Sequence, residues 1–366
     1  MLKYKLSSVF FCMSKPLYVT QPYLPDKEKY YRLLDGVFER NQLTNGGPLL
    51  EDLTGRLKQY LGVKYLLLVA NGTLALQLAY KMKGIANRKV LTTPYTFAAT
   101  ATALDWQGAQ IEFSDIDPQS WNLCPKALES HLSKEEFGAL VPVNLFGMPC
   151  HLDALETLRE RYKVPIIYDS AHALVSRYKG KSIFEYGDIH CISFHATKLF
   201  HTVEGGAMIF RDEADYERAK RLINFGQDQF GNVSEAGINA KMSEVHAAMG
   251  LCVLDDLDTI IANRQNAINI YKERLKGKVQ FQSAKYDQYT TPMYMPVAFK
   301  NEEQLKLCIK SLNDQQIYPR KYFSPEALAF TDISLKKTPS ILCLPLFYSM
   351  PESAIAKIAN CLPYEC

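Results

Sequence analysis

Seven short, almost continuously apolar segments lie between residues 65 and 210, and they restrict the fold more than any other feature of the chain. Segments with helical periodicity separate them. Strands that are apolar on both faces are typical of parallel sheets covered by helices on both sides. We therefore predict an α/β fold with a mostly parallel seven-stranded sheet and helices on both faces. The expected strands are 65–70, 89–93, 109–113, 140–144, 164–168, 190–194 and 207–210.

The helices between these strands are expected at 73–82, 96–106, 152–162 and 213–222, and Thr73, Asp153 and Asp212 offer capping side chains near three of their starts. The pattern changes after about residue 240, where one long helical stretch runs from Ser243 past Tyr271 and a mixed α+β segment follows. We predict a large domain over 14–250 and a smaller C-terminal α+β domain over 251–366.

The first residues, 1–13, read as an N-terminal extension, and Met13 is a plausible alternative start. Their apolar part is short and interrupted by two serines, unlike a signal peptide. No apolar run is long enough to cross a membrane.

Bulk composition excludes several classes of function. The net charge of +3 gives no electrostatic reason to expect a nucleic-acid partner. The nine cysteines include no Cys-x-x-Cys pair, which indicates reduced thiols in a cytoplasmic protein. The seven histidines lack metal-ligand spacing, so we expect no metal site.

Polar and glycine-rich residues follow the ends of several expected strands. In a parallel sheet, ligands bind beyond the carboxyl ends of the strands, so these residues converge on one edge. Lys198 is the most informative of them, because it lies between two apolar strands just before a Glu-Gly-Gly turn. A lysine at such a place is paired, reaches solvent, or has lost its charge by chemistry, most commonly by forming a Schiff base with an aldehyde.

A bound pyridoxal phosphate would require a lysine, a phosphate seat at a helix start, an aromatic stacking face and a carboxylate for its ring nitrogen. The chain offers each at the expected edge. Each residue alone has a simpler structural interpretation as a cap, a core aromatic or a turn residue, but together they favour this cofactor. The candidates are Gly72 and Thr73 for the phosphate, Phe97 for stacking, Asp169 for the ring nitrogen, His172 for the ring, Ser193 for a phosphate contact and Lys198 for the aldehyde.

Other cofactor motifs are absent or incomplete. Gly180-Lys181-Ser182 resembles the end of a phosphate-binding loop, but Val175 occupies the position of its first glycine. No Gly-x-Gly-x-x-Gly follows a strand, which weighs against a nicotinamide enzyme.

From about Leu43 to Ile358 the chain resembles the DegT/DnrJ/EryC1/StrS family of sugar aminotransferases, which have fold type I of the pyridoxal-phosphate enzymes. The motifs that carry the resemblance are Leu-Thr-Asn-Gly-Gly-Pro-Leu at 43–49, Asn-Gly-Thr-Leu-Ala-Leu at 71–76, Pro-Tyr-Thr-Phe-Ala-Ala-Thr at 94–100, Tyr-Asp-Ser-Ala-His-Ala at 168–173, the run 193–207 and Gly-Ile-Asn-Ala-Lys-Met-Ser-Glu at 237–244.

The resemblance implies specific roles. Lys198 would form the Schiff base and Asp169 would pair with the ring nitrogen, while Asn239 would reach the cofactor phosphate of a neighbouring subunit in a homodimer. Retention of Lys198 excludes the dehydratase chemistry of relatives that carry histidine there. The resemblance also yields candidate substrate contacts at Asn45, His195, Arg320, Lys321 and Tyr322, of which Arg320 or Lys321 would meet a diphosphate or form only a solvated basic turn.

The strings Ser-Phe-His-Ala-Thr-Lys at 193–198 and Met-Ser-Glu-Val-His-Ala-Ala-Met-Gly-Leu at 242–251 are similar to enzymes acting on dTDP-keto-6-deoxyhexoses. This similarity implies transfer of an amino group from L-glutamate to dTDP-4-keto-6-deoxy-D-glucose, giving dTDP-4-amino-4,6-dideoxy-D-glucose for a surface glycan such as O-antigen. A 3-aminotransferase acting on a dTDP-3-keto-6-deoxyhexose and a non-catalytic regulatory protein that binds pyridoxal phosphate are the alternatives. The sequence leaves open the site of amination, its stereochemistry, dTDP against UDP, and the final glycan.

Overall fold

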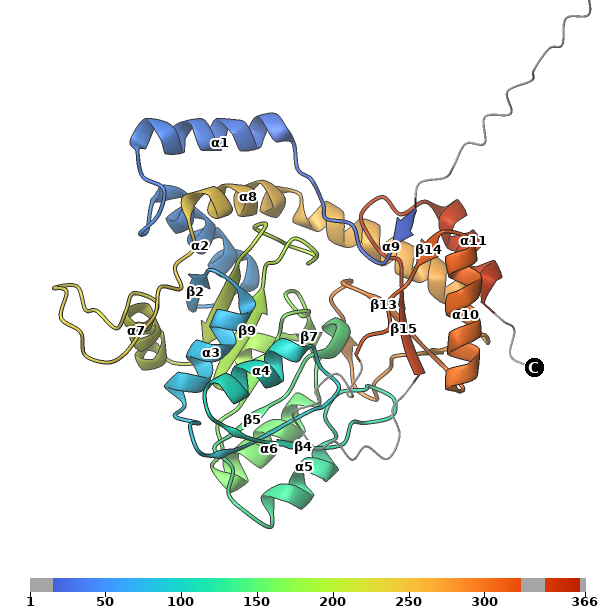
Figure 1. Ribbon diagram of the computed structural model, residues 1–366, viewed down its shortest axis with the longest axis horizontal. Helices are drawn as coiled ribbons and strands as arrows, with labels where there is room; N and C mark the ends of the chain where they lie inside the picture. The colour runs from blue at the N-terminus through green and yellow to red at the C-terminus, as the bar shows by residue number, and fades with distance from the viewer. Residues whose placement is uncertain (1–15, 324–339, 363–366) are drawn as a thin grey trace, which may run out of the picture.

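A computed structural model describes residues 16–323 and 340–362. Its centre is one twisted sheet in which all seven predicted strands occur (Figure 1). The bridges Leu140↔Ile166 and Val143↔Asp169 join two hydrogen-bonded groups of strands, β2-β10-β9-β6 and β5-β3-β4. The predicted α/β fold is confirmed. The strands are β2 (Tyr65–Val69), β3 (Lys89–Thr92), β4 (Gln110–Phe113), β5 (Ala139–Val141), β6 (Ile167–Asp169), β9 (Ile189–Ser193) and β10 (Gly206–Phe210).

Strand β10 is the exception to parallel pairing, because it runs antiparallel to both of its neighbours, β2 and β9. A parallel connection requires a long crossover, which is usually a helix. The segment 194–205 between β9 and β10 contains no helix and returns the chain directly beside β9. This return places Lys198 in the loop at the carboxyl end of β9.

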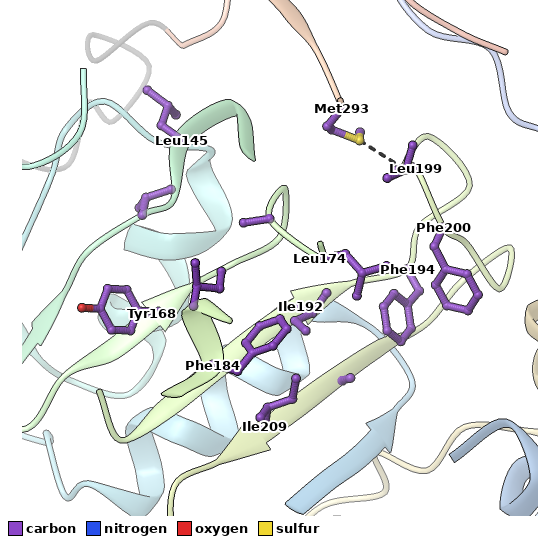
Figure 2. Packing of buried hydrophobic residues seen from close by; sticks show 14 of the residues in the cluster. Leu145, Tyr168, Leu174, Phe184, Ile192, Phe194, Leu199, Phe200, Ile209 and Met293 are labelled. Carbon is purple, nitrogen blue, oxygen red and sulfur yellow. Dashed lines mark hydrogen bonds between the residues drawn. The ribbon is translucent and has the colours of Figure 1, made fainter. Parts of the chain in front are cut away.

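Helices cover both faces of the sheet, and alternate strand residues supply the two apolar layers. One layer packs Val90, Ile167 and Cys191 against α3 (Gly72–Met82), α4 (Ala98–Trp106) and α7 (Glu213–Leu222). The other layer includes Ile192 and Ile209, which Figure 2 shows beside Tyr168, Phe184 and Phe194. Its helices are α2 (Pro48–Leu61), α5 (Pro125–Leu132), α6 (Leu152–Tyr162) and α8 (Glu244–Asp255).

The structure corrects three local predictions. Asn71 caps α3 and His151 caps α6, in place of Thr73 and Asp153, because each lies three residues before the N–H group that its side chain accepts. The long helix predicted from Ser243 is two helices, α8 and α9 (Leu257–Arg274). They meet at Asp256, whose φ of −101° and ψ of 0° interrupt the helical backbone.

The C-terminal part contains a third apolar cluster, built around α9, α10 (Glu302–Asp314) and α11 (Glu352–Cys361). Its sheet has the order β11-β13-β15, from Gln280–Phe281, Met295–Phe299 and Ser340–Leu344. The remaining elements are β1 (Leu17–Tyr18), α1 (Lys27–Arg40), η1 (Leu145–Gly147), β7 (Arg177–Tyr178), β8 (Lys181–Ser182), η2 (Ile183–Glu185), β12 (Gln288–Tyr289) and β14 (Ile317–Tyr318). The domain division at residue 250 stays a prediction, and the predicted extension with Met13 lies outside the described residues.

In the described ranges, none of the helices combines the length and apolarity that crossing a membrane requires.

Candidate active site

A cavity of about 330 Å³ lies at the carboxyl ends of β6 and β9, beside the N-terminus of α3. This volume is within the range of small-molecule sites. From the C-terminal part, Tyr294, Arg320, Tyr322 and Phe323 complete its wall. The structure brings together ten of the predicted site residues in the lining: Gly72, Thr73, Phe97, Asp169, His172, Ser193, His195, Lys198, Arg320 and Tyr322.

Lys198 occupies the loop after β9 and lines the cavity. The backbone N–H of Lys198 donates to the His195 carbonyl at 2.8 Å, and the N–H of Leu199 points to the Met293 sulfur, as Figure 2 shows. The surrounding protein disfavours the ammonium form and lowers the pKa of Lys198 to about 8, while nearby Asp169 opposes this shift. At pH 7 about a tenth of the amine is therefore unprotonated, far more than for a lysine at its usual pKa of 10.5, and this neutral form is the one that a proton-transfer base requires.

Asp169 is the last residue of β6 and is 5% exposed. The Thr100 hydroxyl donates to its Oδ2 at 2.7 Å, and the Ala171 N–H donates to its Oδ1 at 3.1 Å. Burial raises the pKa of Asp169, whereas these two hydrogen bonds and Lys198 act in the opposite direction. A buried carboxyl with two fixed donors is suited to holding a proton on a ring nitrogen.

His172 is a neutral ring in this site, because burial lowers its pKa well below the usual value and nearby Lys198 adds to the shift. The Phe146 N–H donates to Nδ1 at 3.3 Å, so the ring proton lies on Nε2. The ring is parallel to that of Phe323 at 6.2 Å between centroids and meets Tyr294 edge-on at 5.0 Å. These contacts fix the plane of the imidazole.

The start of α3 offers a seat for an anion. The Asn71 side chain accepts the Leu74 N–H, while the N–H groups of Gly72 and Thr73 have no acceptor among the described residues. A β-carbon at Gly72 would lie 3.0 Å from the Ser193 β-carbon, so glycine permits the close approach of helix and strand. Two free N–H groups at a helix N-terminus beside a serine hydroxyl are appropriate donors for a phosphate.

Three predicted site residues lie outside the cavity lining. Asn45 is exposed and has a φ of 64°. Asn239 is also exposed, and its backbone forms an isolated antiparallel β-bridge with Asn224. Lys321 is exposed, and its amine pairs with Glu302 at 3.0 Å. Of the two adjacent basic residues, 320 and 321, only Arg320 lines the cavity.

The lining also contains residues that the sequence did not single out, including Thr96, Glu204, Tyr294 and Phe323. Thr96 and Thr100 are four residues apart at the start of α4, and their hydroxyls lie 2.7 Å from each other. Thr96 precedes the extended N-cap Phe97, so this contact forms across the helix start and not along one face of the helix. Phe323 directly follows Tyr322, a predicted substrate contact, whereas Tyr294 gave no signal because it reaches the site from a distant part of the chain.

The residues present fit pyridoxal phosphate. Free N–H groups suit its phosphate, Phe97 is 56% exposed at the cavity and could stack on its ring, Asp169 suits the ring nitrogen, and the partly unprotonated Lys198 suits the aldehyde. The fold and the site together define a pyridoxal-phosphate-dependent transferase of fold type I.

Comparison with known proteins places the chain within that class. Residues 26–362 match the DegT/DnrJ/EryC1/StrS aminotransferase family, and the chain belongs to this family. It is a pyridoxal-phosphate-dependent aminotransferase.

Individual relatives cover most of the chain. The dTDP-4-amino-4,6-dideoxy-D-glucose transaminase of Shigella dysenteriae is 33% identical over 95% of this chain and 98% of its own length. The UDP-4-amino-4,6-dideoxy-N-acetyl-beta-L-altrosamine transaminase of Campylobacter jejuni is 33% identical over 68% of each chain. The crystal structure of DesI in the presence of its TDP-sugar product superposes with a TM-score of 0.86 at 32% identity, covering 95% of this chain and 92% of DesI.

Proposed function

We propose that the protein transfers an amino group from L-glutamate to dTDP-4-keto-6-deoxy-D-glucose and so forms dTDP-4-amino-4,6-dideoxy-D-glucose. The observation that carries this proposal is the placement of Lys198 and Asp169 in one cavity of a chain that aligns over 95% of its length with the Shigella transaminase. The proposed setting is the cytoplasm, where free thiols persist, and the proposed use of the product is a surface glycan such as O-antigen.

Lys198 has the central role in the proposed mechanism. Pyridoxal phosphate, when bound, supplies an aldehyde that carries the amino group and a ring that spreads the negative charge of the reacting carbon. In the half-reaction with glutamate, the Lys198 amine would take the proton from the α-carbon of glutamate and deliver it to the carbon that keeps the amino group when the keto acid leaves. Its pKa of about 8 allows it to act as base and then as acid near neutral pH. In the second half-reaction it moves the proton in the reverse direction.

Other residues bind and orient the reactants. Asp169 would keep the ring nitrogen of the cofactor protonated, and the N–H groups of Gly72 and Thr73 would hold its phosphate together with the Ser193 hydroxyl. Arg320, whose guanidinium lies 5.0 Å from the centre of the Tyr322 ring, lines the cavity and would meet the sugar diphosphate.

We also propose a homodimer in which Asn239 completes the phosphate seat of the neighbouring subunit. Asn239 is exposed and outside the cavity of its own chain, and the segment that precedes it carries exposed apolar side chains. Phe230 is 79% exposed, Val233 64% and Phe225 49%. Exposed apolar groups on one segment are typical of a surface that another protein covers.

The test is a reaction with defined nucleotide sugars. The protein, loaded with pyridoxal phosphate, is incubated with glutamate and dTDP-4-keto-6-deoxy-D-glucose, and the product is identified by NMR. A new amine at C4 is expected. Product only from a dTDP-3-keto-6-deoxyhexose would establish the 3-aminotransferase instead, and turnover only of the UDP-linked sugar would reassign the nucleotide. Omission of glutamate is the control for the donor.

A further inference from the structure

Three buried polar side chains lie behind the cofactor cavity, on the face of the sheet opposite Asp169. They are Asn144, which follows β5, Ser170, which follows β6, and His190 within β9, and none is more than 1% exposed. We call them the far-face chain. Polar groups are costly in a sheet interior unless every one is hydrogen-bonded, so their presence in this apolar layer requires a reason.

The bonds of the far-face chain have a defined direction. His190 Nε2 lies 2.8 Å from the Tyr186 carbonyl, which can only accept, so Nε2 carries the ring proton. Nδ1 must then accept, and the Ser170 hydroxyl donates to it at 2.9 Å. Asn144 Nδ2 donates to the Ser170 oxygen at 3.0 Å, and the Cys150 N–H donates to Asn144 Oδ1 at 2.9 Å. The far-face chain therefore links three adjacent strands, β5, β6 and β9.

Ser170 connects this chain to the active site through the backbone. Side chains of neighbouring strand residues point to opposite faces, so Asp169 faces the cavity while Ser170 faces away from it. The Ser170 N–H donates to the Cys191 carbonyl at 2.8 Å, and the next N–H, that of Ala171, donates to Asp169 Oδ1 at 3.1 Å. The position of Ser170 thus determines where the Ala171 donor points and how the Asp169 carboxylate is held.

We propose that Asn144, Ser170 and His190 are positioning residues that fix the Asp169 carboxylate for the cofactor ring nitrogen. The inference rests on the proposed role of Asp169. It assigns a function to polar side chains that touch neither cofactor nor substrate.

The two residues that flank Asp169 allow a matched test. Ser170→Ala removes a hydroxyl that has two partners. Tyr168→Phe, the control, removes a hydroxyl that is buried without a partner in the described residues, on a ring that stacks on His190 at 4.6 Å. Figure 2 shows Tyr168 within the apolar cluster of this layer. For each apoprotein we would measure the dissociation constant for pyridoxal phosphate, the visible circular dichroism of the bound cofactor and the thermal unfolding temperature.

We expect Ser170→Ala to bind pyridoxal phosphate roughly 5- to 10-fold more weakly, which is the change in affinity that the loss of one or two hydrogen bonds produces. The visible dichroic band of the bound cofactor should also change. Tyr168→Phe should match the wild type. A second variant, His190→Phe, approaches the chain from another strand and should reproduce the effect of Ser170→Ala, so that the test survives if one variant does not fold.

Wild-type affinity and dichroism in Ser170→Ala, with only a lower unfolding temperature, would overturn the inference, because the chain would then be merely structural. Asp169→Asn is the reference for the underlying role. If Asp169→Asn leaves the band and the affinity unchanged, the role of Asp169 itself is wrong. If Asp169→Asn changes them and neither far-face variant does, only the positioning inference is wrong.

Discussion

At the scale of single residues, the chemistry depends on how the protein changes the proton affinity of Lys198. The surroundings lower its pKa from 10.5 to about 8. Because the folded-state value lies below the unfolded one, the unfolded state binds the proton more tightly, and the ammonium form costs stability below pH 8. The cost decreases as the pH rises from 8 to 10.5 and is absent above that range. The lowered pKa that makes Lys198 suitable for catalysis therefore reduces the stability of the folded apoprotein below pH 8.

Replacing Lys198 should separate activity from stability. We expect Lys198→Met to abolish amino transfer and the absorbance of the bound aldehyde linkage. At pH 7 the apoprotein should gain roughly 1–3 kcal/mol of unfolding free energy, because a protonated amine no longer loses its hydration. Urea unfolding at pH 7 and pH 10 measures this gain, which should decrease at the higher pH.

The matched control is Lys321→Met, because Lys321 is an exposed lysine outside the cavity lining and paired with Glu302. Its unfolding free energy should change by less than about 1 kcal/mol. Normal turnover in Lys198→Met would contradict the catalytic assignment.

Asp169 gives a second prediction at this scale. Asp169→Asn keeps the size of the side chain and removes the charge that would hold a proton on the cofactor ring. We expect kcat to fall by roughly 100-fold or more, because the cofactor ring would lose the carboxylate that keeps its nitrogen protonated. The far-UV circular dichroism spectrum should stay native. Thr100→Val should have a smaller effect, because Asp169 keeps its charge and its bond from Ala171. A near-normal rate in Asp169→Asn with the cofactor bound would contradict the assignment.

At the scale of elements, helix starts are completed by residues distant in sequence. Helix α2 begins after Gly47, which has no side chain to cap it. Glu244, fully buried at the start of α8, accepts the N–H groups of Leu49 at 3.0 Å and Leu50 at 2.8 Å instead. One carboxylate thus satisfies two donors of another helix and interacts favourably with its dipole.

Removal of this carboxylate should destabilise the fold without touching the cavity. We expect Glu244→Ala to lower the unfolding free energy by roughly 2–4 kcal/mol, because two buried N–H groups lose their acceptor. Glu51→Ala is the control, since Glu51 is an exposed carboxylate in the first turn of the same helix, and its loss should cost less than about 1 kcal/mol. Equal unfolding midpoints for the two variants in urea would show that the Glu244 cap is unimportant.

At the scale of the whole molecule, the cavity is assembled from distant parts of the chain. The helix start at 72, the loop at 198 and residues 320, 322 and 323 all line it. Tyr95, in the large part, donates its hydroxyl to the Tyr322 carbonyl at 2.5 Å and holds the C-terminal segment beside the cavity. The same logic extends to the proposed homodimer, in which Asn239 would serve the neighbouring site.

Mixed dimers test that sharing. Lys198→Ala and Asn239→Asp should each be strongly impaired alone, the second because a carboxylate would face the cofactor phosphate. Coexpression of the two should restore about a quarter of the wild-type activity, since half of the dimers are mixed and each has one intact site. Activity equal to the sum of the separate variants would show that Asn239 acts only within its own subunit.

Prediction from sequence succeeded where local patterns carry the information. Apolar runs gave the seven strands, and the rule that ligands bind at carboxyl strand ends anticipated the meeting of Lys198 and Asp169 in one cavity. It failed at helix boundaries such as Asp256. One non-helical residue there separates α8 from α9, but the apolar residues keep their helical spacing across it. It also missed Tyr294, because no local pattern records which distant segment packs over a site.

The sequence by itself determined the order of strands and helices, the family, and the residue types that the cofactor requires, because these depend on periodicity and on motifs within short stretches. Only the tertiary structure decided that β10 runs antiparallel, that Arg320 rather than Lys321 lines the cavity, and that Ser170 and His190 bond behind Asp169. These outcomes depend on contacts between residues far apart in the chain. Desolvation of Lys198 is of the same kind, since a lowered pKa arises only when distant segments enclose the amine.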